Sequence, residues 1–130
     1  MLGTSTVWHF DVDRGPDWVF VTPVPATELA ENLAEQDHSD FADTIWEITQ
    51  LHQCSRVVVE LGAIPVICST LLGQLIFLAK RVHSHGGILR LTGLSATNQS
   101  VLHTCRLESA LPSFSNRADA VKGYRPIQPR

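Results

Sequence analysis

The sequence predicts an α/β sandwich: a mixed central β-sheet of four to five strands, beginning with an N-terminal hairpin and covered by about four α-helices. Three observations lead to this fold class. Residues 6–22 alternate apolar and polar side chains on either side of a turn, which is typical of a hairpin. The run Arg56–Leu61 is continuous and β-branched, as in a strand covered on both faces. After it, strand-like runs alternate with amphipathic helical stretches, which favours parallel pairing.

The N-terminal hairpin consists of two predicted strands, Thr6–Val12 and Trp18–Thr22. Arg14–Asp17, between them, contains the Gly, Pro and Asp residues that turns require. Because Pro23 and Pro25 have no backbone N–H to donate, we expect the strand pairing to end there.

Two further segments precede the central strand. Residues 26–38 are rich in Ala, Glu and Leu and are compatible with either a short helix or a loop. Ser39 or Asp40 can cap a first helix that runs to about Gln53. Apolar positions recur in this helix at three- and four-residue spacing: Phe41, Ile45, Trp46, Ile48 and Leu51.

A second, longer helix is expected from about Thr70 to His83, ended by Gly86 and Gly87. Its apolar face comprises Leu71, Leu72, Leu75, Ile76, Leu78, Ala79 and Val82. The later elements are a strand over Ile88–Thr92, a third helix capped within Ser95–Asn98 and reaching Cys105, an extended piece at Ser113–Phe114, and a helical turn over Ala118–Val121. We therefore expect a single domain over residues 1–121 and a polar C-terminal tail over residues 122–130.

Composition and charge exclude several classes of function. The net charge of −3 comes from scattered side chains, without the basic stripe that nucleic-acid binding requires. The longest apolar stretch, residues 71–79, is shorter than the roughly 20 residues of a spanning helix, and no secretory leader opens the chain. The three cysteines form no CxxC pair, and we expect buried, reduced thiols, which favours a cytoplasmic location without direct membrane insertion.

A series of landmarks follows the valine-rich strand. Gly62 ends the strand, the segment Cys68-Ser69-Thr70-Leu71-Leu72-Gly73 opens the long helix, and Gly93-Leu94-Ser95 follows the next strand. With these landmarks the chain resembles the STAS family, in particular its anti-sigma factor antagonists, over about residues 19–121. The resemblance implies a STAS-like sandwich and a protein-binding module without a cofactor or catalytic activity. It also implies a partner, an anti-sigma factor that is a serine-protein kinase, whose sequestration releases a sigma factor and so regulates transcription.

The resemblance assigns phosphorylation to Ser69, with Thr70 as the alternative. A serine at the start of a helix lies beside unpaired N–H groups, and a phosphate adds about −1.5 to −2 charges that repel a partner shaped for a neutral serine. The purely structural alternative is that Ser69 or Thr70 caps the helix. The expected partner-binding residues are Cys68, Ser69, Thr70, Leu71, Leu72, Gln74, Gly93, Leu94 and Ser95.

Two positions depart from the family motif. Cys68 stands where an acidic residue usually precedes the serine, so it supplies no fixed negative charge to a kinase or to a helix cap. Leu71 replaces a glycine and either adds an apolar side chain to the partner-contact surface or packs inward. Gly73 is retained, and we expect the helix to approach neighbouring backbone there.

Three alternative interpretations compete with this one. The first is a STAS domain that serves as a signalling scaffold or as an accessory subunit of a transport system, without regulated phosphorylation. The second is an enzyme with Cys68 as nucleophile, although the six histidines are scattered without a spacing that ties one of them to Cys68. The third is a metal site at His83 and His85, which lack further ligands at zinc spacing. No glycine-rich phosphate-binding motif is present, so nucleotide binding is not expected.

Overall fold

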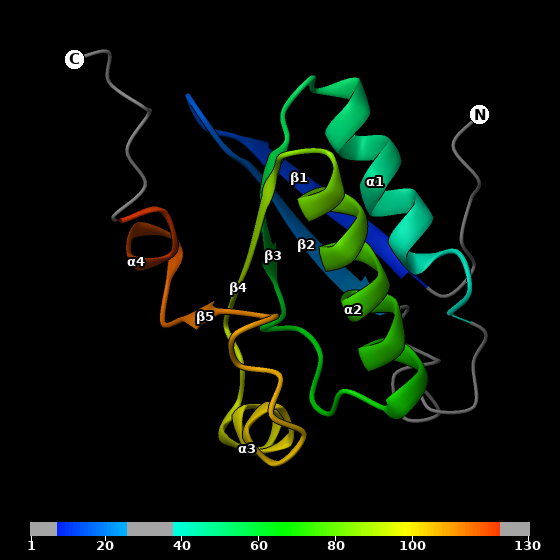
Figure 1. The fold of residues 1–130 in the computed structure, drawn as a ribbon, viewed down its shortest axis with the longest axis vertical. Helices are drawn as coiled ribbons and strands as arrows, with labels where there is room; N and C mark the ends of the chain where they lie inside the picture. Colours follow the sequence, from blue (N-terminus) through cyan, green and yellow to red (C-terminus); the bar gives the residue numbers. More distant parts are fainter. Residues whose placement is uncertain (1–7, 26–37, 123–130) are drawn as a thin grey trace.

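Five strands and four helices form in residues 8–25 and 38–122, which are the residues that the computed structural model describes (Figure 1). Their bounds in chain order are β1 Trp8–Arg14, β2 Val19–Pro25, α1 Phe41–Leu51, β3 Arg56–Glu60, α2 Ser69–Ser84, β4 Ile88–Thr92, α3 Ala96–Thr104, β5 Ser113–Phe114 and α4 Arg117–Val121. The predicted α/β fold with an N-terminal hairpin and a mixed, helix-covered sheet is confirmed. Within the described ranges, every helix falls short of the length and apolarity that a membrane span requires.

The strands lie across the sheet in chain order, β1-β2-β3-β4-β5. β1 and β2 are antiparallel, and the other three neighbouring pairs are parallel. Each parallel connection contains a helix: α1 between β2 and β3, α2 between β3 and β4, and α3 between β4 and β5. The loops that follow β3 and β4 therefore leave the sheet at the same edge, where open α/β sheets commonly place their binding sites.

The continuous valine run of β3 is explained by burial on both faces. Val57 and Val59 belong to the main core, which α1 and α2 cover (Figure 1). Val58 points to the opposite face, because successive strand residues alternate, and packs in a smaller cluster with Trp18 and Ala120 of α4. All three valines are fully buried, so no position in the run could be polar without losing core contacts.

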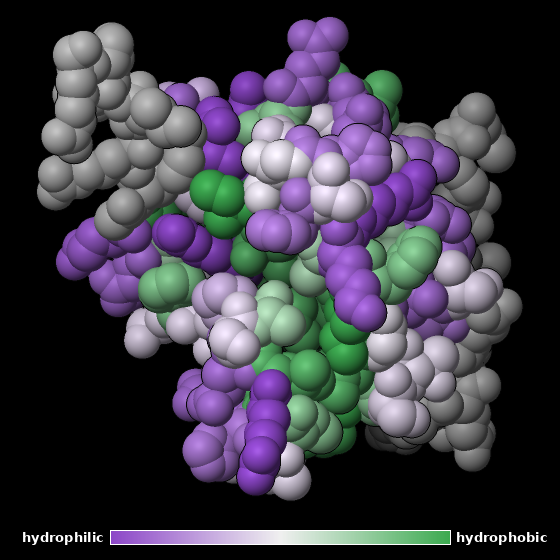
Figure 2. All heavy atoms as spheres, viewed as in Figure 1, coloured by the Kyte–Doolittle hydropathy of each residue, from purple (hydrophilic) through white to green (hydrophobic). Residues whose placement is uncertain are grey.

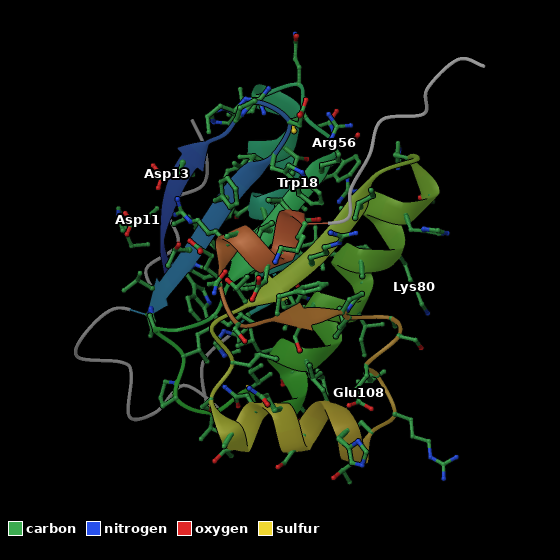
Figure 3. All side chains as sticks on the ribbon, turned by 90° about the vertical axis from the view of Figure 1, so that its left-hand side faces the viewer. Asp11, Asp13, Trp18, Arg56, Lys80 and Glu108 are labelled. Carbon is green, nitrogen blue, oxygen red and sulfur yellow. The ribbon has the colours of Figure 1, made fainter. Side chains whose placement is uncertain are left out.

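An ionic cluster around Arg117 fixes the start of α4 to the second face of the sheet, the face toward the viewer in Figure 3. Its guanidinium donates hydrogen bonds to both carboxylate oxygens of Glu60, at 2.7 and 2.9 Å, and lies 2.8 Å from a carboxylate oxygen of Asp13. The hydrogen bonds from Arg117 hold the pKa of Glu60 below its ordinary value of 4.5, although partial burial acts in the opposite direction. α4 is thus attached to β3 by charge as well as by packing.

The hairpin is longer than the sequence predicted. Pro23 pairs with Phe10 and Pro25 pairs with Trp8, so the prolines do not end the antiparallel pairing. β2 pairs with β3 only over residues 19–21, and no other described strand pairs with that edge of its second half. Proline is compatible with such an edge because no N–H donor is required there.

Two expectations about side chains were also wrong. Leu51 is 67% exposed, because it is the last residue of α1 and lies beyond the part of the helix that packs on the sheet. Cys105 is exposed just after α3, whereas Cys54 is buried and Cys68 is half-buried; all three are free thiols.

The sequence left residues 26–38 open between a short helix and a loop, and residues 26–37 lie outside the described residues. His38 is buried, and its Nδ1 accepts a hydrogen bond from Trp8 Nε1 at 3.1 Å.

Candidate docking surface

Ser69 is the first residue of α2, and its side chain is exposed. The first helical hydrogen bond of α2 runs from Leu72 N to Cys68 O at 2.9 Å, so the N–H groups of Ser69, Thr70 and Leu71 precede the helical ladder. Cys68, the N-cap, makes no side-chain cap hydrogen bond, and the first turn contains no acidic residue. This helix end therefore has a partial positive charge that no side chain of its own first turn compensates.

A line of exposed residues extends from Ser69 along α2. Gly73 and Phe77 follow Ser69 at four-residue intervals, so the three lie on one face of the helix, with Thr70 beside them. Phe77 is 53% exposed, as is Val66 in the loop before the helix. We call these five residues, Val66, Ser69, Thr70, Gly73 and Phe77, the docking surface. A modifiable hydroxyl and an exposed aromatic ring therefore lie on the same face of α2.

The loop that precedes Ser69 is held by a buried side chain from α3. Asn98 is fully buried, and its side-chain oxygen accepts from Ile67 N at 2.9 Å while its nitrogen donates to Ile64 O at 3.1 Å. The backbone N–H of Asn98 in turn donates to the Ser95 hydroxyl at 3.1 Å, which caps α3. The loop after β4 and the loop before α2 are thereby linked through one residue.

Gly93 allows the ends of β3 and β4 to lie close together. Its φ of +75° is in the left-handed region, and a Cβ at this position would lie 2.9 Å from Gly62 N. The strand ends are also joined by a hydrogen bond from Leu61 N to Thr92 O at 2.8 Å. The exposed Gly93 and Ser95 consequently border the same sheet edge from which the loop to α2 leaves.

The structure does not bring all of the predicted partner-binding residues to this surface. Leu71 is fully buried, so its side chain packs inward, and its expected role in partner contact is corrected. Gln74 faces α1, where its side-chain oxygen accepts from Ala42 N at 2.9 Å and so caps that helix. The remaining apolar candidates, Cys68, Leu72 and Leu94, are half-buried against the main core.

Gly73 does not have the role that the sequence suggested. A Cβ at Gly73 would meet no atom within 4 Å, so no close approach of neighbouring backbone requires a glycine. The position is exposed in the middle of the docking surface. Glycine in a helix interior costs about 0.5–1 kcal/mol relative to alanine, and nothing inside the domain compensates that cost here.

Sequence reasoning missed three residues of this region: Val66, Phe77 and Asn98. Phe77 falls outside the apolar stripe of α2, which a helical projection of residues 69–84 would have shown. Asn98 lies four residues before the buried Leu102 and so on the buried face of α3, a signal of a hydrogen-bonded buried amide. Val66 lies in an irregular loop, where periodicity gives no signal.

Comparison with solved structures shows the same fold in other proteins. A protein of Thermotoga maritima assigned as an anti-sigma factor antagonist superposes with a TM-score of 0.69 at 18% identity, over 87% of this chain and 92% of that chain. A chain of the stressosome, a signal integration and transduction hub, has a TM-score of 0.66 at 17% identity, over 85% and 92%. The anti-sigma factor antagonist SpoIIAA of Bacillus, in its unphosphorylated form, has a TM-score of 0.56 at 13% identity, over 91% and 100%.

These identities are all low, so the superpositions establish the shared fold. A search of curated protein sequences finds no match. The profile of the STAS domain matches residues 26–120. This range includes α1 to β5, most of α4 and the whole docking surface. The chain therefore belongs to the STAS domain family.

Proposed function

We propose that this chain is an anti-sigma factor antagonist that acts by competitive binding. In its unphosphorylated form it binds an anti-sigma factor that is a serine kinase, through the docking surface and the adjoining Gly93–Ser95 loop, and a sigma factor is released. Phosphorylation of Ser69 ends the binding. Resemblance of the fold to anti-sigma factor antagonists supports the partner class.

The observation that carries this proposal is the exposed position of Ser69 beside apolar side chains. Phe77 lies two helical turns, about 12 Å, after Ser69 on the same face of α2, and a partner that contacts both residues would also cover the Ser69 hydroxyl. A phosphate on that hydroxyl would bring about −1.5 to −2 charges into the same desolvated contact. A partner without a compensating cation would be rejected, because burying an unpaired charge is strongly unfavourable.

The two departures from the family motif have different consequences. Leu71 is buried, so replacing the family glycine changes the underside of α2 and leaves the docking surface unaltered. Cys68 stands where the family motif has an acidic residue before the serine, and the first turn of α2 contains no acidic residue that could replace it. We infer a kinase that recognises this segment without reading a carboxylate before the serine.

The contribution of Phe77 is tested with purified chain and an anti-sigma factor kinase encoded in the same genome. Phe77→Ser removes an exposed apolar side chain from the docking surface, and we expect at least a tenfold loss of affinity by isothermal titration calorimetry. Leu51→Ser is the matched control, because Leu51 is equally apolar, is exposed, and lies at the end of α1 outside the docking surface. Equal effects of the two substitutions would contradict the proposal.

A second candidate function is a STAS scaffold within a larger signalling assembly, without regulated phosphorylation; the accessory subunit of a transport system is a variant of it. The similarity to a stressosome chain favours the scaffold. The docking surface would then form a permanent contact. Affinity for such an assembly that does not change when kinase and ATP are added would support this candidate over the first.

The proposed activity includes no chemical step performed by this chain. Cys68 is half-buried, and in the described part of the chain no hydrogen bond joins its thiol to a histidine. The positive end of α2 favours a thiolate at Cys68, but without a hydrogen-bonded base among the described residues and with a half-buried sulfur we expect little nucleophilic reaction there. Titration with a thiol reagent at neutral pH tests this statement: Cys68 should react more slowly than the exposed Cys105, and faster reaction at Cys68 would revive the enzymatic alternative.

A further inference from the structure

A hollow of about 420 Å³ opens between α2 and the segment that leads from α3 to β5. Figure 2 shows the corresponding apolar patch in the middle of this face of the molecule. The walls are mainly apolar and include Ile76, Ala79, Leu89, Ala110 and Pro112, while the Ile88 side chain packs on the second face of the sheet. Its volume is within the range of about 300–1,000 Å³ that small-molecule sites occupy.

The hollow follows from an incomplete layer of helices. α1 and α2 cover the main core on this face, and α2 contacts β4. β5 has only two residues, and in the described ranges no third helix lies beside α2 over this end of the sheet (Figure 1). Residues 107–112 fill part of the gap and leave Ile76 partly exposed, while Leu89 forms the buried floor.

The rim of the hollow carries one lysine ammonium group and one imidazole. Lys80 and His83, one helical turn apart on α2, line it, and Figure 3 shows Lys80 extending toward the segment that carries Glu108. Among the described residues neither Lys80 nor His83 takes part in an ion pair. The nearby carboxylate of Glu108 is held by His103 at 3.1 Å, and no carboxylate lines the hollow. An anion at this rim would therefore meet positive charge that the described part of the chain does not neutralise.

We propose that this hollow binds a small amphipathic anion, a medium-length acyl chain that ends in a carboxylate. The chain lies against the apolar walls, and the carboxylate lies at the rim beside Lys80 and His83. The site is separate from the docking surface: Lys80 follows Ser69 by eleven residues, about 16 Å along the helix axis. Ile76 of the hollow and Phe77 of the docking surface are neighbours in the sequence, but they point to different sides of α2, and the proposed carboxylate site lies about three helical turns from Ser69.

The test uses the complete chain with hexanoate and octanoate, each below its micellar concentration. Calorimetry should show saturable binding, and the amide resonances of Gly87, Ile88 and Ala110 should shift. Octanoate should bind roughly tenfold more tightly than hexanoate, since two more methylenes are covered by the walls. Octanol should bind more weakly than octanoate, because it has no charge for the rim.

Three variants make the assignment specific. Ala110→Phe places a ring in the hollow from an exposed loop position and should abolish binding, with the amide spectrum confirming the fold. Lys80→Gln should weaken octanoate about tenfold and leave octanol unchanged. Lys122→Gln, which removes the same charge next to α4 on the other side of the sheet, is the control and should bind as the original chain does.

Several results would overturn the proposal. They are the absence of saturable binding, unchanged binding to Ala110→Phe, or equal effects of Lys80→Gln and Lys122→Gln. Self-association of the chain that Ala110→Phe disrupts, without carboxylate binding, would show that a second copy covers the hollow instead. In each case the proposed docking of a kinase at Ser69 would be unaffected.

Discussion

Replacing Ser69 with Asp should stabilise the domain while abolishing partner binding. Ser69 is the first residue of α2, its side chain is exposed, and neither a cap hydrogen bond nor an acidic residue serves this helix end. A carboxylate in the first turn interacts favourably with the helix dipole by about 0.3–1 kcal/mol. Because Ser69 is exposed and the first turn of α2 contains no acidic residue, we expect about 0.5 kcal/mol, within that range.

The stability change is measured by urea and thermal unfolding at low ionic strength. A gain of 0.5 kcal/mol corresponds to a rise in Tm of about 1–4 °C for a domain of this size. The gain should shrink in 1 M salt, where the screening length falls to about 3 Å. Ser84→Asp is the matched control, since it adds the same charge at the other end of α2, where it should destabilise by a similar amount.

Binding of Ser69→Asp to the kinase should fall at least tenfold, although the domain is more stable. A gain in stability together with a loss of affinity distinguishes a docking role of Ser69 from a purely structural one. If Ser69 were only a helix cap, the Asp variant would retain both stability and affinity. A destabilised Ser69→Asp chain, or one with unchanged affinity, would refute the reasoning from the helix end.

Four further substitutions test the docking surface and the framework of the domain. Asn98→Ala leaves two buried backbone groups without partners and should cost about 2–4 kcal/mol in urea unfolding; a loss below 1 kcal/mol would contradict its role. Gly93→Ala should destabilise by about 1–3 kcal/mol because of its positive φ and the close Gly62 backbone. Gly73→Ala should instead stabilise by about 0.5–1 kcal/mol yet weaken docking, since only the outer surface uses that glycine. Arg117→Gln should lower stability near pH 7. Because the folded pKa of Glu60 is depressed, this difference should be complete above about pH 4.5 and shrink as the pH falls through the folded pKa; a difference independent of pH would exclude the pair as its source.

Local periodicity was sufficient to predict most of the fold. The valine run of β3 and the apolar stripe of α2 are regular signals, because each element buries a repeating set of positions against the core. The prediction that Pro23 ends the strand was wrong because a proline interrupts pairing only where the neighbouring strand needs an N–H donor at that position. The pairing of β2 with β3 stops at Val21, and this is a property of the folded sheet. The prediction that Leu51 is buried was wrong because the apolar periodicity of a helix does not show where the helix extends beyond the core.

The candidate site was only partly accessible to sequence reasoning. The position of Ser69 at the start of α2 follows from the motif and the helical pattern. The inward direction of Leu71 and the hydrogen bond from Ala42 to Gln74 depend on how α1 and α2 are packed, which no local pattern encodes. Asn98 acts over a separation of about thirty residues, so its contacts with the loop appear only when the chain is folded.

The most direct test of the central claim is phosphorylation by an anti-sigma factor serine kinase from the same genome. The purified chain and a Ser69→Ala variant are incubated with the kinase and ATP, analysed by mass spectrometry, and then tested for binding. The account predicts one phosphate on Ser69 of the original chain, none on the variant, and loss of binding after modification. Absence of phosphate on both Ser69 and Thr70, together with absence of binding before modification, would contradict it.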